Sequence, residues 1–289
     1  IYQKNEMIFK NFSDLIEYSS RKYSKKTFLL SANKNYKNLT FNELKKFKEN
    51  FQVFLDNHKI KEKDRILVVM HNSNLLTLLF LSIISNFRIF VPLNPTTAVE
   101  EIKYILAQTK PKIIIGFDIY KKKLLSLNIK KKFFIKDEQK FINYILNIKS
   151  SNCKKKKIKG NFIAQILFTS GSTGKPKGVV LTHYSILSNL DGIKKRLGIK
   201  IRKPKFLAVT PLFHNNGQFI PTLLPLVLGG TSTPIPSDTS ILNFWEVSSK
   251  NQINYSSVMA THINYFVKID KKRKHGYLKT LFCGGAKLD

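Results

Sequence analysis

A run of glycine, serine and threonine residues, closed by two lysines, stands between two apolar segments at residues 166–182, ILFTSGSTGKPKGVVLT. Glycine adopts positive φ without a steric penalty, so the backbone N–H groups of such a loop can turn toward one point. Converging N–H groups, hydroxyls and ammonium groups together suit a polyphosphate. The residues expected to contact it are Thr169, Ser170, Gly171, Ser172, Thr173, Gly174, Lys175, Lys177 and Gly178. The sequence therefore predicts a phosphate-binding loop between two strands.

This loop is not a Walker-type P-loop. The Walker pattern, Gly-x-x-x-x-Gly-Lys-Ser/Thr, requires glycine where Thr169 stands and a hydroxyl where Pro176 stands. A flexible Gly/Ser linker is the alternative interpretation. Ordinary linkers, however, are not flanked by two apolar strands and closed by Lys-Pro-Lys-Gly, so we favour phosphate binding.

Two further motifs hold residues that could contribute to a site. PLFHNNG at 211–217 contains His214, and CGGAKLD at 283–289 contains Gly284, Gly285 and Ala286 after an apolar segment. A lone histidine is more often structural than catalytic, and Gly-Gly-Ala by itself indicates only a turn. Spacing alone leaves both assignments open.

The stretch FTSGSTGKPKGVVLTH resembles the signature loop of the adenylate-forming (AMP-binding) superfamily, with a match that is nearly continuous from Ile166 to His183. That superfamily includes acyl-CoA synthetases, luciferases and peptide-synthetase adenylation domains. PLFHNNG is similar to its PLFH-x-x-G motif, and CGGAKLD resembles its GGA-P-L segment, with Lys287 where proline is usual. TFNEL at 40–44 and VPLNP at 91–95 are weaker similarities. Together the likeness spans nearly the whole chain.

The resemblance implies a role for each motif. The loop would wrap the β- and γ-phosphates of ATP, with Lys175 and Thr173 as catalytic residues and Thr173 also contacting Mg²⁺. His214, the third catalytic residue, would line the pocket between ATP and the acyl carboxylate. The glycines and alanine of 284–286 would pack against the adenine.

The PLFH form of the second motif favours an AMP-forming acyl-CoA synthetase. Such an ATP-dependent acid–thiol ligase activates a fatty or aryl acid as acyl-AMP and transfers the acyl group to coenzyme A. The alternatives are an acyl-AMP ligase or adenylation domain that loads a carrier protein, and a non-catalytic remnant of the fold.

Alternating strand-like and helix-like segments must position these motifs. Thr40 and Glu43 predict a capping box at the start of a helix. Helices are predicted at 41–58, 73–84, 98–109 and 183–196, and strands at 65–70, 89–95, 112–117, 162–168, 178–182, 205–210, 231–235, 254–259 and 278–283. This order predicts an α/β fold of layered parallel sheets flanked by helices on both faces.

We expect residues 1–289 to form an incomplete N-terminal domain of an adenylate-forming enzyme. It would divide into a first βα region at 1–119, a variable lysine-rich surface segment with a linker at 120–160, and a second βα region with the phosphate loop at 161–289. The family's C-terminal domain, with its catalytic lysine, is expected to be absent. These 289 residues alone should therefore bind ATP weakly and not turn over.

The net charge of +32 raises the question of a nucleic-acid partner. Only six of the 50 basic residues are arginine, although base and phosphate recognition favours the arginine fork. No basic motif interleaved with aromatic residues is present either. The expected partners are therefore ATP, a carboxylic acid and coenzyme A, and not nucleic acid.

Cysteine use and hydropathy bear on the cellular compartment. Cys153 and Cys283 lie too far apart for a disulfide framework or a metal motif. This fits a reducing, cytoplasmic location. The longest apolar stretch, residues 75–84, is shorter than the ~20 residues that cross a bilayer. We predict a buried helix there and no transmembrane segment, which leaves peripheral membrane contact open.

Overall fold

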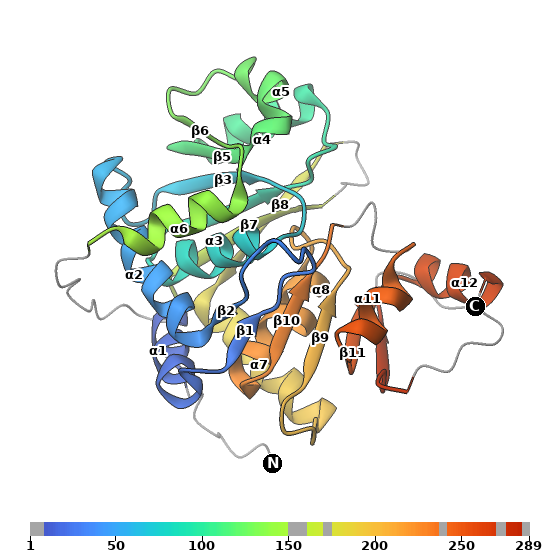
Figure 1. Cartoon of the computed structure of the whole chain (residues 1–289). Coiled ribbons are helices and arrows are strands. Elements are labelled where there is room, and N and C mark those ends of the chain that lie inside the picture. The colour runs from blue at the N-terminus through green and yellow to red at the C-terminus, as the bar shows by residue number, and fades with distance from the viewer. Residues whose placement is uncertain (1–8, 150–160, 170–174, 237–241, 270–275, 285–289) are drawn as a thin grey trace, which may run out of the picture.

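The computed structural model describes residues 9–149, 161–169, 175–236, 242–269 and 276–284, and within them the strands form two six-stranded sheets (Figure 1). Sheet A has the order β12 (Thr280–Cys283), β11 (Tyr255–Val258), β9 (Lys205–Ala208), β10 (Thr231–Pro234), β1 (Thr27–Leu29) and β2 (Leu39–Thr40). Sheet B has the order β6 (Lys132–Ile135), β5 (Ile113–Phe117), β3 (Arg65–Val69), β4 (Ile89–Leu93), β7 (Ile163–Thr169) and β8 (Lys177–Thr182). The α/β fold with layered sheets is confirmed.

Both sheets are mixed, and not purely parallel. Each ends in an edge strand that runs antiparallel to its neighbour, β2 beside β1 in sheet A and β8 beside β7 in sheet B. The remaining pairs are parallel. The two antiparallel pairs join strands that are adjacent in the chain, which a short connection permits, whereas parallel pairs need a crossover.

Sheet B is apolar on both faces because helices cover both. Along β3, Ile66 and Val68 pack into the cluster that also contains residues of α3 (Asn74–Ser85) and α6 (Glu138–Asn147). Leu67 and Val69 point the other way, toward residues of α4 (Val99–Thr109) and α5 (Lys121–Leu125). Figure 1 shows the same division. The continuous apolar runs in the sequence are the consequence.

The other helices cover the remaining surfaces. They are α1 (Phe12–Tyr23), α2 (Phe41–Asn57), α7 (His183–Leu197), α8 (Asn215–Gln218), α9 (Leu224–Leu228), α11 (Phe244–Lys250) and α12 (Ala260–Ile269), with a 3₁₀ turn at Asp118–Tyr120 and a π turn at Phe219–Leu223. The predicted capping box of α2 is confirmed. Glu43 N–H donates to Thr40 Oγ1 over 3.1 Å, and Thr40 N–H donates to Glu43 Oε2 over 2.8 Å.

The apolar stretch predicted as a buried helix is α3, and all 12 of its residues are buried. Within the described parts of the chain, we find no helix with the length and apolar character needed to cross a bilayer.

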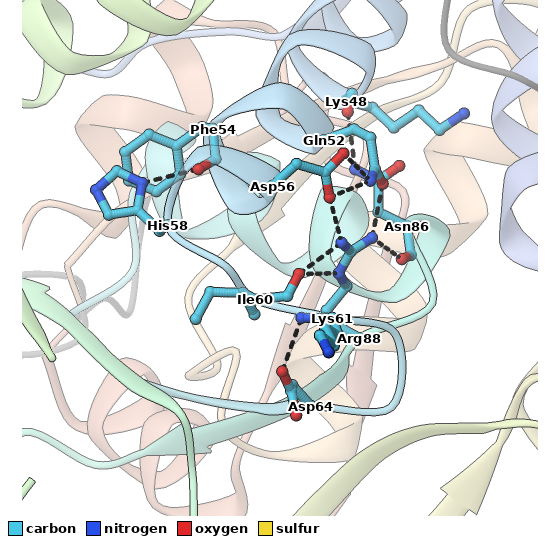
Figure 2. Close-up of polar contacts among 10 residues, drawn as sticks. All are labelled: Lys48, Gln52, Phe54, Asp56, His58, Ile60, Lys61, Asp64, Asn86 and Arg88. Atoms are coloured by element: carbon cyan, nitrogen blue, oxygen red, sulfur yellow. Dashed lines mark hydrogen bonds and ion pairs between the residues drawn. The ribbon is translucent and has the colours of Figure 1, made fainter. Parts of the chain in front are cut away.

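A buried arginine fixes the start of β4 against the end of α2 (Figure 2). Arg88 is 2% exposed, yet its guanidinium donates to Gln52 Oε1, Asp56 Oδ1 and the carbonyls of Ile60 and Asn86 at 2.7–2.9 Å. Burial lowers the pKa of Arg88, and Asp56 opposes this shift. A buried charge is tolerated only when it is paired and hydrogen-bonded, as it is here.

One sequence expectation needs correction. The lysine-rich segment at 120–160 is not merely surface and linker, since α5, β6 and α6 lie within it and β6 pairs with β5. The strands of the N-terminal region are divided between the two sheets. Its strands β1 and β2 belong to sheet A, where Leu29 is in register with Ser232 of β10.

Candidate functional site

The predicted phosphate loop joins the two strands of a hairpin. Thr169 ends β7 and is in register with Lys177, which begins β8. Gly178, also predicted to bind, lies within β8 opposite Phe168 and is exposed, like Lys177. Thr169 and Lys177, which stand on either side of the loop, are therefore held by strand pairing. Five predicted contacts lie outside the described residues: Ser170, Gly171, Ser172, Thr173 and Gly174.

Lys175 is exposed beside this hairpin. Its Nζ lies 5.9 Å from the ring centroid of Tyr104 on α4, within range of a cation–π interaction. Tyr104 was not predicted as a neighbour of Lys175, because the two residues lie about 70 positions apart in the sequence. The order of the strands in sheet B brings α4 to the hairpin.

The 211–217 segment leaves sheet A after β9 and makes a compact turn into α8. His214 N–H donates to the Pro211 carbonyl over 3.0 Å, and Gly217 N–H donates to the His214 carbonyl over 3.1 Å. A Cβ on Gly217 would lie 2.3 Å from the Pro211 oxygen and 2.5 Å from the Thr210 oxygen. Only glycine fits this close approach of backbone to backbone.

His214 stands at the N-terminal end of α8 with its side chain exposed and its ring 4.6 Å from that of Phe213. Part of the imidazole is shielded from water, and this desolvation lowers its pKa. The ring is therefore mainly neutral at pH 7 and can donate or accept a hydrogen bond without placing a positive charge beside a substrate.

Gly284 brings the third motif to this turn. It follows β12, its N–H donates to the Val258 carbonyl over 3.3 Å, and a Cβ placed on it would lie 2.9 Å from Asn216 Nδ2. The PLFHNNG segment and Gly284 thus meet beyond the carboxyl ends of β9 and β12, the two parallel strands on either side of β11 in sheet A. This is the usual location of ligand sites in α/β sheets. Gly285 and Ala286 lie outside the described residues.

Two buried glutamines connect the turn to the hairpin, and we did not predict them. Gln165 of β7 donates from Nε2 to Gln218 Oε1 over 2.7 Å, and Gln218 donates from Nε2 to the Leu212 carbonyl over 2.9 Å. The sequence carried a signal, because Gln165 interrupts an otherwise apolar strand. The hairpin that holds the phosphate loop and the turn that holds His214 are thereby in direct contact.

His183, the last residue of the signature stretch, is structural. It is fully buried among Phe12, Phe87 and Phe162, and its Nδ1 accepts a hydrogen bond from Phe12 N–H over 3.2 Å. Desolvation lowers its pKa to about 4. Nδ1 is an acceptor, so the proton of the neutral ring resides on Nε2. The ring therefore anchors α7 to α1 and is far too buried to meet a substrate.

The residues that the structure describes contain no group of three or more His, Cys, Asp or Glu side chains that could hold a metal ion. Thr173, the expected Mg²⁺ contact, is among the residues outside the description.

The chain is similar to known proteins over most of its length. The family described as "AMP-binding enzyme" matches residues 16–289. Peroxisomal OPC-8:0-CoA ligase 1 of Arabidopsis thaliana is 24% identical over 266 residues, which are 87% of this chain and 48% of that protein. Bacitracin synthase 1 of Bacillus licheniformis is 30% identical over 133 residues, which are 45% of this chain and 2% of that protein. The chain thus spans at most about half the length of these two relatives.

Among solved structures, the inhibitor-bound N-terminal domain of FACL13 from Mycobacterium tuberculosis superposes with a TM-score of 0.84 at 17% identity. The superposition covers 97% of this chain and 71% of that domain. At this identity the likeness establishes the shared fold.

Proposed function

Because the chain belongs to the AMP-binding enzyme family, we propose that it is part of an ATP-dependent ligase that activates a carboxylic acid as its acyl-adenylate and passes the acyl group to coenzyme A. Adenylate formation is the general activity of that family. The finer assignment, to a fatty or aryl acid and to coenzyme A as acceptor, is our proposal.

The observation that carries this proposal is the meeting of three motifs at one place. The turn at 211–217 contacts Gly284 on one side and, through Gln218, the hairpin of the predicted phosphate loop on the other. A nucleotide on the loop and a carboxylate beside His214 would therefore bind to adjoining segments. Adjacent binding is what a reaction between the two substrates requires.

The first step joins the acid to AMP. A carboxylate oxygen attacks the α-phosphorus of ATP, a P–O bond forms, and the bond to the β-phosphate oxygen breaks to release pyrophosphate. Charge neutralisation and positioning are the main protein contributions to such a transfer. We propose that the ammonium groups of Lys175 and Lys177 neutralise the phosphate charge. The loop from Thr169 to Gly174 would supply hydrogen-bond donors to the phosphate oxygens.

The second step exchanges the activated oxygen for sulfur. The thiol sulfur attacks the acyl carbon, the C–O bond to AMP breaks, and the thiol proton leaves to solvent or a nearby base. We propose that neutral His214 donates a hydrogen bond from its ring N–H to the carboxylate in the first step. A positive imidazolium there would stabilise the reactant carboxylate more than the less charged adenylate.

Mg²⁺ would accompany ATP. Magnesium in nucleotide sites is usually held by substrate phosphates, water and one or two protein oxygens, and it neutralises phosphate charge. The described side chains offer no cluster for it, so we assign it no residue beyond the expectation for Thr173 and derive no step from it.

Two relatives point to different acceptors. The Arabidopsis protein that aligns with 87% of this chain is named a CoA ligase, whereas the Bacillus protein that aligns with 45% is named a bacitracin synthase. The more extensive alignment favours coenzyme A. An enzyme that loads a carrier protein, and a non-catalytic remnant, remain the competing hypotheses.

The test uses the full-length gene product with a panel of fatty and aryl acids. We expect ATP–pyrophosphate exchange that depends on the acid, and AMP release that rises when coenzyme A is added. Exchange without stimulation by coenzyme A would favour the carrier-loading alternative. Absence of exchange with every acid would favour the remnant.

A further inference from the structure

A chain of buried amide groups ties the predicted phosphate hairpin to the 211–217 turn. Gln165, in the middle of β7, and Gln218, at the end of α8, are both fully buried. The chain runs from Gln165 Nε2 to Gln218 Oε1 over 2.7 Å, and from Gln218 Nε2 to the Leu212 carbonyl over 2.9 Å.

The direction of this chain follows from chemistry. The Leu212 carbonyl can only accept, so Gln218 must present its NH₂ group to it and its oxygen to Gln165. Gln165 must then present its own NH₂ group. Its Oε1 is buried with no partner among the described residues. Inverting either amide would place two donors or two acceptors opposite each other. The row of hydrogen bonds therefore permits only one orientation of the two side-chain amides.

Asn72 makes a second tie from sheet B to the same turn. It follows β3 and is 2% exposed. Its Oδ1 accepts from Leu212 N–H over 2.8 Å, and its Nδ2 donates to the carbonyls of Thr210 over 3.0 Å and Ala208 over 3.3 Å. Both backbone groups of Leu212 are therefore held by side chains, one by Gln218 and the other by Asn72.

Apolar packing alone would not fix the position of the 211–217 turn relative to the hairpin. Apolar contact between sheets is non-directional, and a leucine or methionine would fill the space of either glutamine. A buried amide is costly unless it is satisfied, and here one glutamine oxygen remains without a described partner. What the amides add over apolar side chains is a fixed distance and direction between two backbone segments.

We propose that Gln165, Gln218 and Asn72 are positioning residues, which hold the turn containing His214 at a fixed separation from the hairpin that presents Lys175. This inference rests on the proposed function in so far as the two segments carry the two substrates. None of the three residues need touch a substrate. Their effect is on the alignment of the carboxylate with ATP, to which rates are highly sensitive.

The kinetic test uses Gln165→Met and Gln218→Met in the full-length gene product. Methionine keeps the approximate volume and removes the hydrogen bonds. We expect kcat for ATP–pyrophosphate exchange to fall at least about tenfold while KM for ATP changes less than about threefold, because alignment and not ATP contact is lost. The double variant should be little worse than Gln218→Met alone, since both belong to one chain.

Asn50→Leu is the matched control. Asn50 is 1% exposed and donates from Nδ2 to the carbonyls of Ile145 over 2.8 Å and Leu146 over 3.1 Å, which joins α2 to α6. The Asn50→Leu variant loses buried hydrogen bonds of the same kind as the glutamine variants. Its thermal stability should fall by a comparable amount, but its kcat should stay within about twofold of the wild-type value. Wild-type kcat in Gln218→Met, or an equal loss in Asn50→Leu, would overturn the proposal.

A second readout needs no catalysis. Hydrogen–deuterium exchange of the backbone amides in 211–217 should accelerate about tenfold in Gln165→Met, although that residue lies on another sheet, and should not change in Asn50→Leu. Unchanged exchange in both glutamine variants would refute the positioning role even if the enzyme is active. If the glutamine variants exchange faster than the wild type but the wild type itself shows no pyrophosphate exchange, the tie between hairpin and turn is supported and the proposed function is rejected.

Discussion

Replacing His183 by phenylalanine should remove a strong pH dependence of stability. The imidazole is fully buried in an aromatic cluster and its pKa in the fold is about 4, against an ordinary value of 6.5. The folded state therefore disfavours the protonated ring. Above pH 6.5 both states carry the neutral ring, and no stability is lost. As the pH falls from 6.5 toward 4, the unfolded chain takes up a proton that the native protein does not.

The size of this effect follows from the shift. Each pKa unit corresponds to about 1.4 kcal/mol. Lowering the pH until His183 is protonated in both states therefore reduces the free energy of unfolding by about 3 kcal/mol, of which about 2 kcal/mol is lost by pH 5. This is a large fraction of the 5–15 kcal/mol that is typical of a folded domain, taken as a rough range.

Urea unfolding followed by circular dichroism at pH 7.5 and pH 5 measures this loss. His183→Phe should be less stable than the wild type at pH 7.5 because Phe12 N–H loses its acceptor. Between the two pH values, however, the wild type should lose about 2 kcal/mol more than the variant. Phe12→Leu serves as the control, since it weakens the same cluster but retains the imidazole and hence the pH dependence. Parallel losses in the wild type and His183→Phe would refute the reasoning.

Other substitutions test the remaining contacts. Gly217→Ala should lower pyrophosphate exchange by at least about tenfold, because its Cβ would overlap the Pro211 oxygen and displace the turn. Arg88→Met should reduce the free energy of unfolding by about 3 kcal/mol in urea titrations, since the Ile60 and Asn86 carbonyls lose their donors. Asp56→Asn should cost at least about 2 kcal/mol in the same titrations, because it leaves the buried guanidinium of Arg88 without its carboxylate partner. Lys175→Ala should slow adenylation at least about tenfold in stopped-flow or exchange assays, and an unchanged rate would remove the loop from the proposed mechanism.

The local elements could be predicted from sequence where burial imposed a pattern. The apolar runs at 65–69, 89–93 and 113–117 are β3, β4 and β5, since a parallel strand covered on both faces tolerates few polar side chains. β1 has three residues, too few to show a periodicity, and it was missed. Residues 120–160 were misjudged because the lysines around β6 hide the short apolar stretch that pairs with β5.

The candidate site was only partly predictable. The motifs around Lys175, His214 and Gly284 were visible because glycine, proline and hydroxyl residues have local geometric requirements. The ties that join them were not, since Gln165 and Gln218 acquire their meaning only when β7 and α8 come together in three dimensions. A glutamine within an apolar strand is a detectable anomaly, but its partner cannot be read from sequence.

The pairing of β1 with β10 has a consequence for protein synthesis. Leu29 leaves the ribosome about 200 residues before Ser232, the residue opposite it in the finished sheet. At the usual elongation speed of about 5–20 residues per second, the nascent N-terminal strand waits on the order of ten to forty seconds for its partner. During that interval β1 and β2 can form no more than a marginal two-stranded ribbon, while all strands of sheet B are already translated once Thr182 has been added. The strands β1 and β2, which are translated before every strand of sheet B, are therefore among the last to become native.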